Sequence, residues 1–123
     1  MSRNRLASVS ALAFAAAGFV LFGRGLAQEL ERGKLLESVP CPAAPGQSYA
    51  LYLPSSFDPA KKWPVLFLFD PGARGPAGVE AFRSAAEAYG WVLAGSNNSR
   101  NGPMQENARA ARAVWADTLR RLP

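Results

Sequence analysis

The fold class of this chain follows from the segment VLFLFDPGARGPAG, Val65 to Gly78. Its first five residues, Val65 to Phe69, are apolar and do not alternate with polar ones. This pattern is typical of a strand covered on both faces, as in a parallel sheet with helices on either side. The proline and glycine residues that follow predict a turn at the end of that strand. The stretch therefore indicates an α/β fold.

A helix and a second buried strand are predicted after this turn. Apolar residues recur at helical spacing, and we expect them to form the buried stripe of the helix: Val79, Phe82, Ala86 and Tyr89. Gly90 follows, where a left-handed residue commonly ends a helix. The apolar run WVLAG, Trp91 to Gly95, then predicts the next strand. Together these elements form a β-α-β unit.

Two further strands are predicted upstream of this unit. They are LLESV, Leu35 to Val39, and SYALYL, Ser48 to Leu53, joined by a loop that holds three prolines and a glycine. A hairpin is the expected result. In the second strand, alternation places one set of side chains on one face, Tyr49, Leu51 and Leu53, and the other set, Ala50 and Tyr52, on the opposite face.

A polar loop, SNNSRNGP, and a long helix follow the last predicted strand. We expect the buried stripe of this helix to be Met104, Ala108, Ala111, Trp115, Leu119 and Leu122, with Glu106, Arg109, Arg112 and Arg120 on the solvent side. The complete prediction is an α/β domain over residues 35–123, with about four strands and two helices.

The first 27 residues are typical of a secretory signal peptide. A cationic start, MSRNR, precedes an apolar stretch from Leu6 to Phe22, and small residues at Gly25 to Ala27 suit cleavage before Gln28. Residues 28–34 are charged, show no pattern and are interpreted as a linker. We therefore expect an exported protein, periplasmic or extracellular, with no stable membrane span after cleavage. The alternative is an uncleaved membrane anchor.

The charge of the chain argues against nucleic-acid binding. The formal net charge is +5, but three arginines lie in the predicted signal peptide, so 11 Lys and Arg remain against 9 Asp and Glu, a balance of +2. No basic stripe is interleaved with aromatic residues. With no His and a single Cys, the sequence predicts neither a metal site nor a cofactor. Cys41 is either an inert buried thiol or the partner of a Cys in another chain.

The segments YALYLPSSFDPAKKWPVLFLFDPGARG, Tyr49 to Gly75, and GWVLAGSNNSRNG, Gly90 to Gly102, together resemble the first half of an α/β-hydrolase of the secreted esterase type. The resemblance implies a strand order beginning 1-2-4-3-5. It also implies that the turn after the third strand donates a backbone N–H to the oxyanion hole. Pro71 has no N–H, so Gly72 and Ala73 are the candidate donors. The alternative is that Pro71-Gly72 only makes a tight turn.

The loop after the fourth strand borders the substrate cleft in the resembled family. This makes Asn97 and Asn98 candidates for hydrogen bonds to a small-molecule ester substrate. The alternative is a polar loop selected for turn formation. Asn97-Asn98-Ser99 also fits a glycosylation sequon.

The catalytic residues of a serine hydrolase are missing from this sequence. It has no His and no G-x-S-x-G nucleophile motif, so we assign no catalytic residue. With four strands in the implied order, Val65 to Phe69 would form an unpaired edge, where self-association is expected. We interpret the chain as an N-terminal fragment of an exported ester hydrolase, inactive alone. The alternative is a small exported α/β binding or interaction domain without catalysis.

Overall fold

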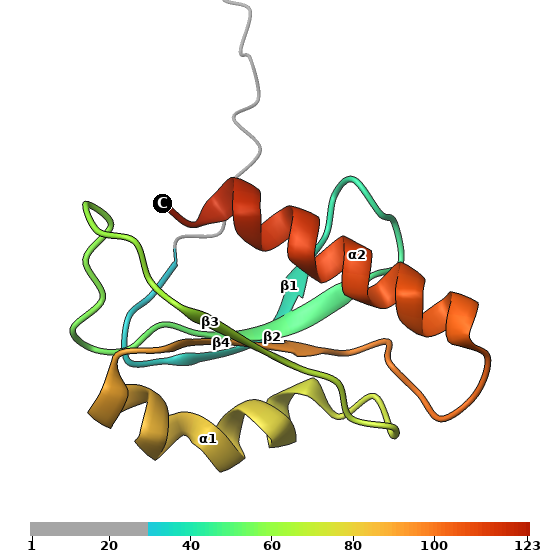
Figure 1. Ribbon diagram of the computed structural model, residues 1–123, viewed down its shortest axis with the longest axis horizontal. Coiled ribbons are helices and arrows are strands. Elements are labelled where there is room, and N and C mark those ends of the chain that lie inside the picture. Colours follow the sequence, from blue (N-terminus) through green and yellow to red (C-terminus); the bar gives the residue numbers. More distant parts are fainter. Residues whose placement is uncertain (1–29) are drawn as a thin grey trace, which may run out of the picture.

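The computed structural model of the chain describes residues 30–123, which form a mixed four-stranded sheet with one helix on each face (Figure 1). The predicted signal peptide, residues 1–27, lies outside the described residues. The elements in chain order are β1 (Leu35–Pro40), β2 (Ser48–Tyr52), β3 (Val65–Leu68), α1 (Gly75–Tyr89), β4 (Val92–Ser96) and α2 (Met104–Arg121). The predicted α/β class, with four strands and two helices, is confirmed. Within residues 30–123, no helix has the length and apolar character needed to cross a membrane.

The order of strands across the sheet is β1-β2-β4-β3, the order that the resemblance implied. The predicted hairpin is present, because β1 and β2 pair antiparallel. β2 pairs antiparallel with β4, and β3 pairs parallel with β4, with Phe67 opposite Ala94. The predicted linker also contacts the sheet, since Arg32 bridges Leu53 and its guanidinium donates to the carbonyl of Phe57 at 3.0 Å.

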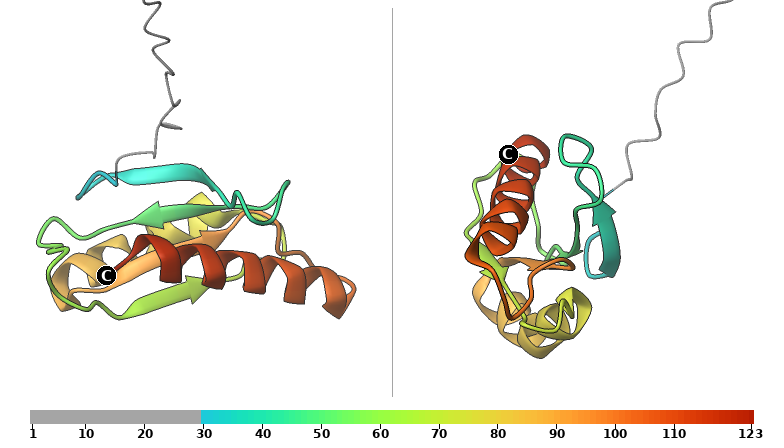
Figure 2. Two further views of the ribbon diagram at one scale, coloured as in Figure 1. Left: turned by 90° about the horizontal axis from the view of Figure 1, so that it is seen from above. Right: turned by 90° about the vertical axis from the view of Figure 1, so that its right-hand side faces the viewer.

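The sheet separates two apolar layers, and the alternation in β2 assigns side chains to each, as predicted. Tyr49, Leu51 and Leu53 belong to the layer that α2 covers with Ala113 and Val114. Ala50 and Tyr52 belong to the layer that α1 covers with Val79 and Ala86. Figure 2 shows α2 lying along one side of the sheet and α1 along the other. Both β2 and β4 are buried because each has a neighbouring strand on both sides.

The predicted buried stripe of α1 is half wrong. Val79 and Ala86 are buried, but Phe82 is 46% exposed and Tyr89 is 78% exposed. Gly90 ends the helix with φ 71°, as predicted. Trp91 is also exposed and lies before β4, not within it. These aromatic side chains face the β3 side of the sheet, where no strand lies beyond Leu66 and Leu68 in the described residues.

The predicted buried stripe of α2 is wrong. The buried residues are Ala110, Ala113, Val114, Asp117 and Thr118, whereas Met104, Trp115 and Leu119 are exposed. The burying face is thus rotated by about one residue, or roughly 100°, from the apolar stripe. The helix contacts β2 and β4 through its small residues, while Trp115 extends sideways to Phe67, with ring centroids 5.4 Å apart. The charged residues predicted on the solvent side are exposed.

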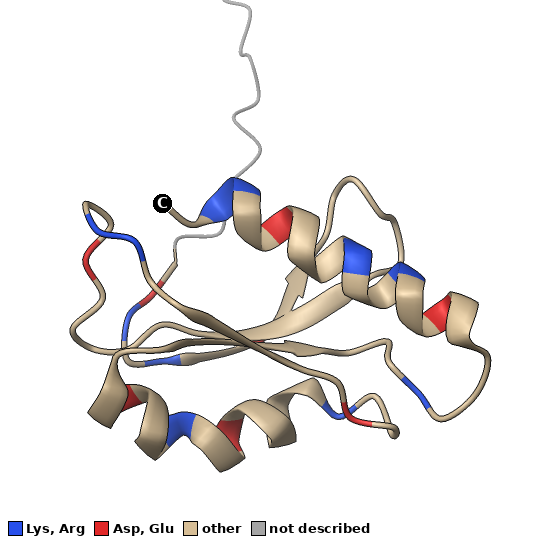
Figure 3. Cartoon of the chain, in the orientation of Figure 1, with Lys and Arg blue, Asp and Glu red and all other residues tan. Residues whose placement is uncertain are grey.

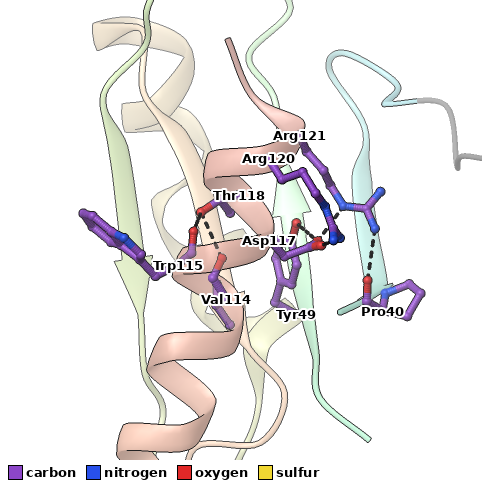
Figure 4. A network of polar contacts seen from close by, with 8 residues as sticks. All are labelled: Pro40, Tyr49, Val114, Trp115, Asp117, Thr118, Arg120 and Arg121. Carbon is purple, nitrogen blue, oxygen red and sulfur yellow. Dashed lines mark hydrogen bonds and ion pairs between the residues drawn. The ribbon is translucent and has the colours of Figure 1, made fainter. Parts of the chain in front are cut away.

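A buried carboxylate fastens α2 to the sheet (Figure 4). Asp117 is 3% exposed and accepts a hydrogen bond of 2.9 Å from the Tyr49 hydroxyl on β2. Arg120 and Arg121 also donate to its two oxygens, and Arg121 reaches further to the carbonyl of Pro40 at 3.0 Å. Burial, followed by the hydrogen bond to Asp117, raises the pKa of the Tyr49 hydroxyl. The network links α2 to β2 through Tyr49 and to β1 through Pro40.

Strand β3 is the edge predicted for Val65 to Phe69, although Phe69 lies just past its end. The expectation of complete cover on both faces is wrong, since all four of its residues are only partly buried. Large exposed apolar side chains lie on both sides of this edge: Phe69, Trp115 and Leu119 on the α2 side, and Phe82, Tyr89 and Trp91 on the α1 side. We call these six residues the β3 edge surface.

Candidate functional site

The turn after β3 is organised around the carboxylate of Asp70. Its Oδ1 accepts the N–H of Gly72 at 2.7 Å, and the Arg74 guanidinium binds both oxygens, at 3.0 and 2.9 Å. The hydrogen bonds from Arg74 and from Gly72 lower the pKa of Asp70 to about 2. Ala73 completes the turn with φ 57°, a left-handed conformation that is uncommon for a residue with a side chain. The turn is thus held by an anion that the chain itself supplies.

Both predicted oxyanion donors are engaged inside this turn. The Gly72 N–H points to the Asp70 carboxylate, and the Ala73 N–H donates to the Asp70 carbonyl at 3.0 Å. The Gly72 amide therefore already binds a negatively charged oxygen, which is the chemistry that an oxyanion donor requires. For Gly72 to bind a substrate oxygen, the Asp70 side chain would have to give up this hydrogen bond.

The loop after β4 is joined to the turn after β3. The Ser99 hydroxyl donates to the Asp70 carbonyl at 2.9 Å, and the Asn101 N–H donates to the Pro71 carbonyl at 2.9 Å. Gly72 also forms an isolated bridge with Arg100. We call the two segments, residues 70–74 and 97–101, the carboxyl-end loops, since they follow the carboxyl ends of two parallel strands. This is the edge at which open α/β sheets bind ligands.

The two predicted cleft residues, Asn97 and Asn98, use their side-chain amide nitrogens to bind the β1–β2 hairpin. Asn97 donates to the Glu37 carbonyl at 3.0 Å and to the Ser48 hydroxyl at 3.2 Å. Asn98 accepts the Ser48 N–H at 2.8 Å and donates to the Gly46 carbonyl at 3.0 Å. These bonds fasten the loop to β1, β2 and their connection. The side-chain nitrogen of Asn97, the first residue of the glycosylation sequon, is engaged in the hydrogen bonds to Glu37 and Ser48.

The start of α1 lies very close to the end of β4. A Cβ on Gly75 would fall 2.4 Å from the carbonyl oxygen of Gly95 and 2.3 Å from Oδ1 of Asn97. A Cβ on Gly95 would fall 2.6 Å from the carbonyl oxygen of Gly75. Only glycine fits at both positions, because backbone atoms occupy the space. This close approach sets the distance between the turn and the sheet.

An apolar cavity of about 510 Å³ opens next to the carboxyl-end loops. Phe67, Phe69 and Trp115 form much of its wall, together with Ala111 and Ala116 of α2. Its volume is in the range of small-molecule sites. Arg112 is the one charged residue among those that line it. The cavity and the carboxyl-end loops meet at Phe69 and Asp70, which are consecutive residues.

Several residues at this site were not predicted from the sequence. Arg74 pairs with Asp70, and Asn107 closes the loop after β4 through two hydrogen bonds with the Arg100 backbone, of 2.9 and 2.8 Å. Opposite charges four residues apart at a helix start would have indicated the first pair. The residues from Leu30 onward contain no cluster of three potential metal ligands.

Cys41 is buried and has no disulfide partner in the described chain. It is 3% exposed, and burial raises the pKa of its thiol. Of the two interpretations offered by the sequence, burial favours the inert thiol.

No protein-family model, curated protein or solved structure matches this chain.

Proposed function

We propose that this domain is the N-terminal part of an exported α/β-hydrolase that cleaves carboxylic esters, and that it contributes the oxyanion turn but not the nucleophile. The observation that carries the proposal is the pair of joined carboxyl-end loops beside an open strand edge. They follow two parallel strands, where an α/β sheet binds its ligand. The strand order β1-β2-β4-β3 agrees with the order that the resemblance implies.

The turn after β3 supports a role in stabilising negative charge. Gly72 already donates its N–H to a carboxylate oxygen at 2.7 Å. In ester hydrolysis, the attack of a nucleophile places negative charge on the substrate carbonyl oxygen, and a preorganised N–H lowers the energy of that state. In the isolated domain, the Asp70 carboxylate occupies the position of such an oxygen at the Gly72 N–H, and Arg74 binds this carboxylate.

The β3 edge surface supports the addition of a further strand and its helices. A strand that paired with β3 would cover its free N–H and C=O groups. The helices next to this added strand would cover Trp115 and Leu119 on the α2 face of the sheet, and Phe82 and Tyr89 on the α1 face. Its carboxyl end would lie next to Asp70, where a nucleophilic Ser would face the Gly72 turn. The 123 residues contain no His and no G-x-S-x-G, so the nucleophile and base have to come from other sequence.

The test is an esterase assay on two forms of the protein. The 123-residue chain should not hydrolyse p-nitrophenyl butyrate above background. The chain joined to the sequence encoded downstream should hydrolyse it, and Gly72→Pro, which removes the N–H, should lower kcat by about 10²-fold. Gly78→Ala, four residues beyond Arg74, is the matched control and should retain activity. Unchanged kcat in a folded Gly72→Pro variant would contradict the role of the turn.

A second candidate function is a small exported binding domain without catalysis. The apolar cavity between Phe69 and Trp115 favours it, because about 510 Å³ accommodates a small apolar ligand. In this case the 123-residue chain should be a stable monomer or a defined dimer. In the hydrolase case, the isolated chain should instead self-associate through Val65–Phe69, since its edge and apolar faces lack their cover.

A further inference from the structure

We propose that a cavity between α2 and the loop connecting β1 to β2 binds a small organic anion through Arg109 and Arg112. The cavity has a volume of about 270 Å³. Helix α2 forms one wall, and the opposite wall consists of Cys41, Ala43 and Ala44. Its volume is just below the range of about 300–1,000 Å³ found for drug-sized ligands, so a smaller molecule fits it.

Three arginines lie along the α2 wall of this cavity: Arg109, Arg112 and Arg120. Their spacings, three and eight residues, return to the same face of a helix. From the sequence alone these side chains are predicted to form a solvated face. The structure adds that they line a concave surface, and Figure 3 shows the positive charges distributed along α2.

Arg109 and Arg112 have no carboxylate partner within residues 30–123. The ion pairs of that part of the chain use other cations, and Arg120 is bound to Asp117. Asp117 is the one acidic residue lining the cavity, so three arginines against one aspartate leave the lining with a formal charge of +2. Unpaired guanidinium groups at a concave surface favour the binding of an anion.

The position of Asp117 does not oppose an anion at Arg109 and Arg112. Asp117 lies five residues beyond Arg112, roughly 7.5 Å further along the helix axis. Its oxygens already accept hydrogen bonds from Arg120, Arg121 and Tyr49. The anionic end of the cavity ligand is therefore assigned to the Arg109 end, away from this carboxylate.

The remaining lining indicates the rest of the ligand. Between the charged positions the wall consists of Ala113 and Ala116, facing the Cys41 thiol and two alanines of the opposite loop. These groups offer apolar contacts and no strong hydrogen-bonding partner. The ligand class is thus an oxyanion, a carboxylate or a phosphate monoester, that carries a short apolar chain, because guanidinium groups bind either head group with two hydrogen bonds.

The first test is a titration of the ¹⁵N-labelled 123-residue chain, followed by NMR, with pentanoate, acetate, inorganic phosphate and pentanamide. Pentanoate should shift the amides of Ala44, Ala113 and Ala116, and should bind more tightly than acetate. Pentanamide, which has the same chain without the charge, should not shift them. Equal effects of pentanoate and pentanamide would overturn the proposal. Phosphate binding as tight as that of pentanoate would show a site for simple anions only, and would overturn the organic part.

Arg109→Gln is the variant of choice, since Arg112 also borders the apolar cavity beside β3. It should weaken pentanoate binding at least about tenfold, the loss expected for a hydrogen bond to a charged group. Arg83→Gln is the matched control, because Arg83 lies on α1 and pairs with Glu80. An unchanged Kd in Arg109→Gln would overturn the proposal.

Discussion

Tyr49 and Asp117 are 68 residues apart in the chain, and a hydrogen bond of 2.9 Å joins them inside the protein. This hydrogen bond connects strand β2 to the buried face of α2. The large apolar side chains of α2 face away from the core, so the helix depends on this polar contact and on small residues for its position.

Tyr49→Phe should lower the free energy of unfolding by about 1.5–3 kcal/mol, because Asp117 then loses one hydrogen bond to a buried charge. Urea unfolding followed by circular dichroism measures this loss. Tyr89→Phe is the control, since Tyr89 is 78% exposed and its change should stay within about 0.5 kcal/mol. Equal stabilities of the two variants would contradict the role given to Asp117.

The stability of the folded chain should also fall as pH rises above about 10. The pKa of Tyr49 is raised by burial and by its hydrogen bond, whereas an unfolded tyrosine has a pKa of about 10. The unfolded state therefore loses this proton first as pH rises, and stability decreases. In Tyr49→Phe the decrease between pH 10 and pH 11 should be smaller than in the unchanged chain. The measurement is urea unfolding at a series of pH values, and parallel curves would exclude Tyr49 as the source.

The carboxyl group of Asp70 should titrate with a midpoint of about 2, observable in the amide shift of Gly72. Because its pKa is lowered from an unfolded value of about 3.9, the interaction stabilises the fold above pH 4 and is lost as pH falls through 2. Arg74→Gln should move the midpoint toward the unfolded value. Arg100→Gln should leave it unchanged, because Arg100 interacts with Glu106. A midpoint near 4 in the unchanged chain would rule out the Asp70–Arg74 arrangement.

Gly75→Ala should destabilise the fold by about 1–3 kcal/mol, because the added Cβ would clash with the Gly95 carbonyl, which belongs to the backbone and cannot rotate away. Gly78→Ala in the same helix is the matched control. There a Cβ would meet only Leu68, at 3.7 Å, and alanine favours helix by about 0.5–1 kcal/mol. Thermal unfolding should therefore move in opposite directions for the two variants. The same direction for both would refute the close approach of α1 and β4.

Phe69→Lys should reduce self-association of the isolated chain, because a charge at the end of the β3 edge opposes pairing of edges. Phe69 is 47% exposed, so the fold should tolerate the change. Met104→Lys is the control, since Met104 is 84% exposed and lies outside the β3 edge surface. Sedimentation velocity measures the size distribution. If Met104→Lys lowered association as much as Phe69→Lys, the effect would come from net charge and not from the edge.

The sequence predicted the positions of the strands well, because the alternation in β2 and the unbroken apolar run in β4 reflect their burial, whereas the similar run in β3 belongs to a strand that is only partly buried. It predicted both helices, but only half of the burying face of α1 and not that of α2, since an apolar stripe shows only which face is apolar. Trp115 and Leu119 satisfy the pattern of a core face, yet α2 packs through Ala113 and Val114. The mismatch leaves Trp115 and Leu119 exposed beside the β3 edge.

The candidate site was predicted in position but not in detail. The glycine-rich turn and the polar loop do meet at the carboxyl end of the strands. The direction of Asn97 and Asn98 could not be predicted, because it depends on Ser48 and Gly46, about 50 residues away. The burial of Asp117 could not be predicted either, because its partner Tyr49 lies on another element, 68 residues away in the chain.

The most direct measurement is the sequence of the coding DNA or transcript through and past codon 123. If the domain is part of a hydrolase, we expect a strand able to pair with β3, then a G-x-S-x-G motif, an acid and a His, in the same frame or after a single frameshift. A stop codon after Pro123, with no such motif downstream in any frame, would contradict this expectation and leave the domain as a binding module.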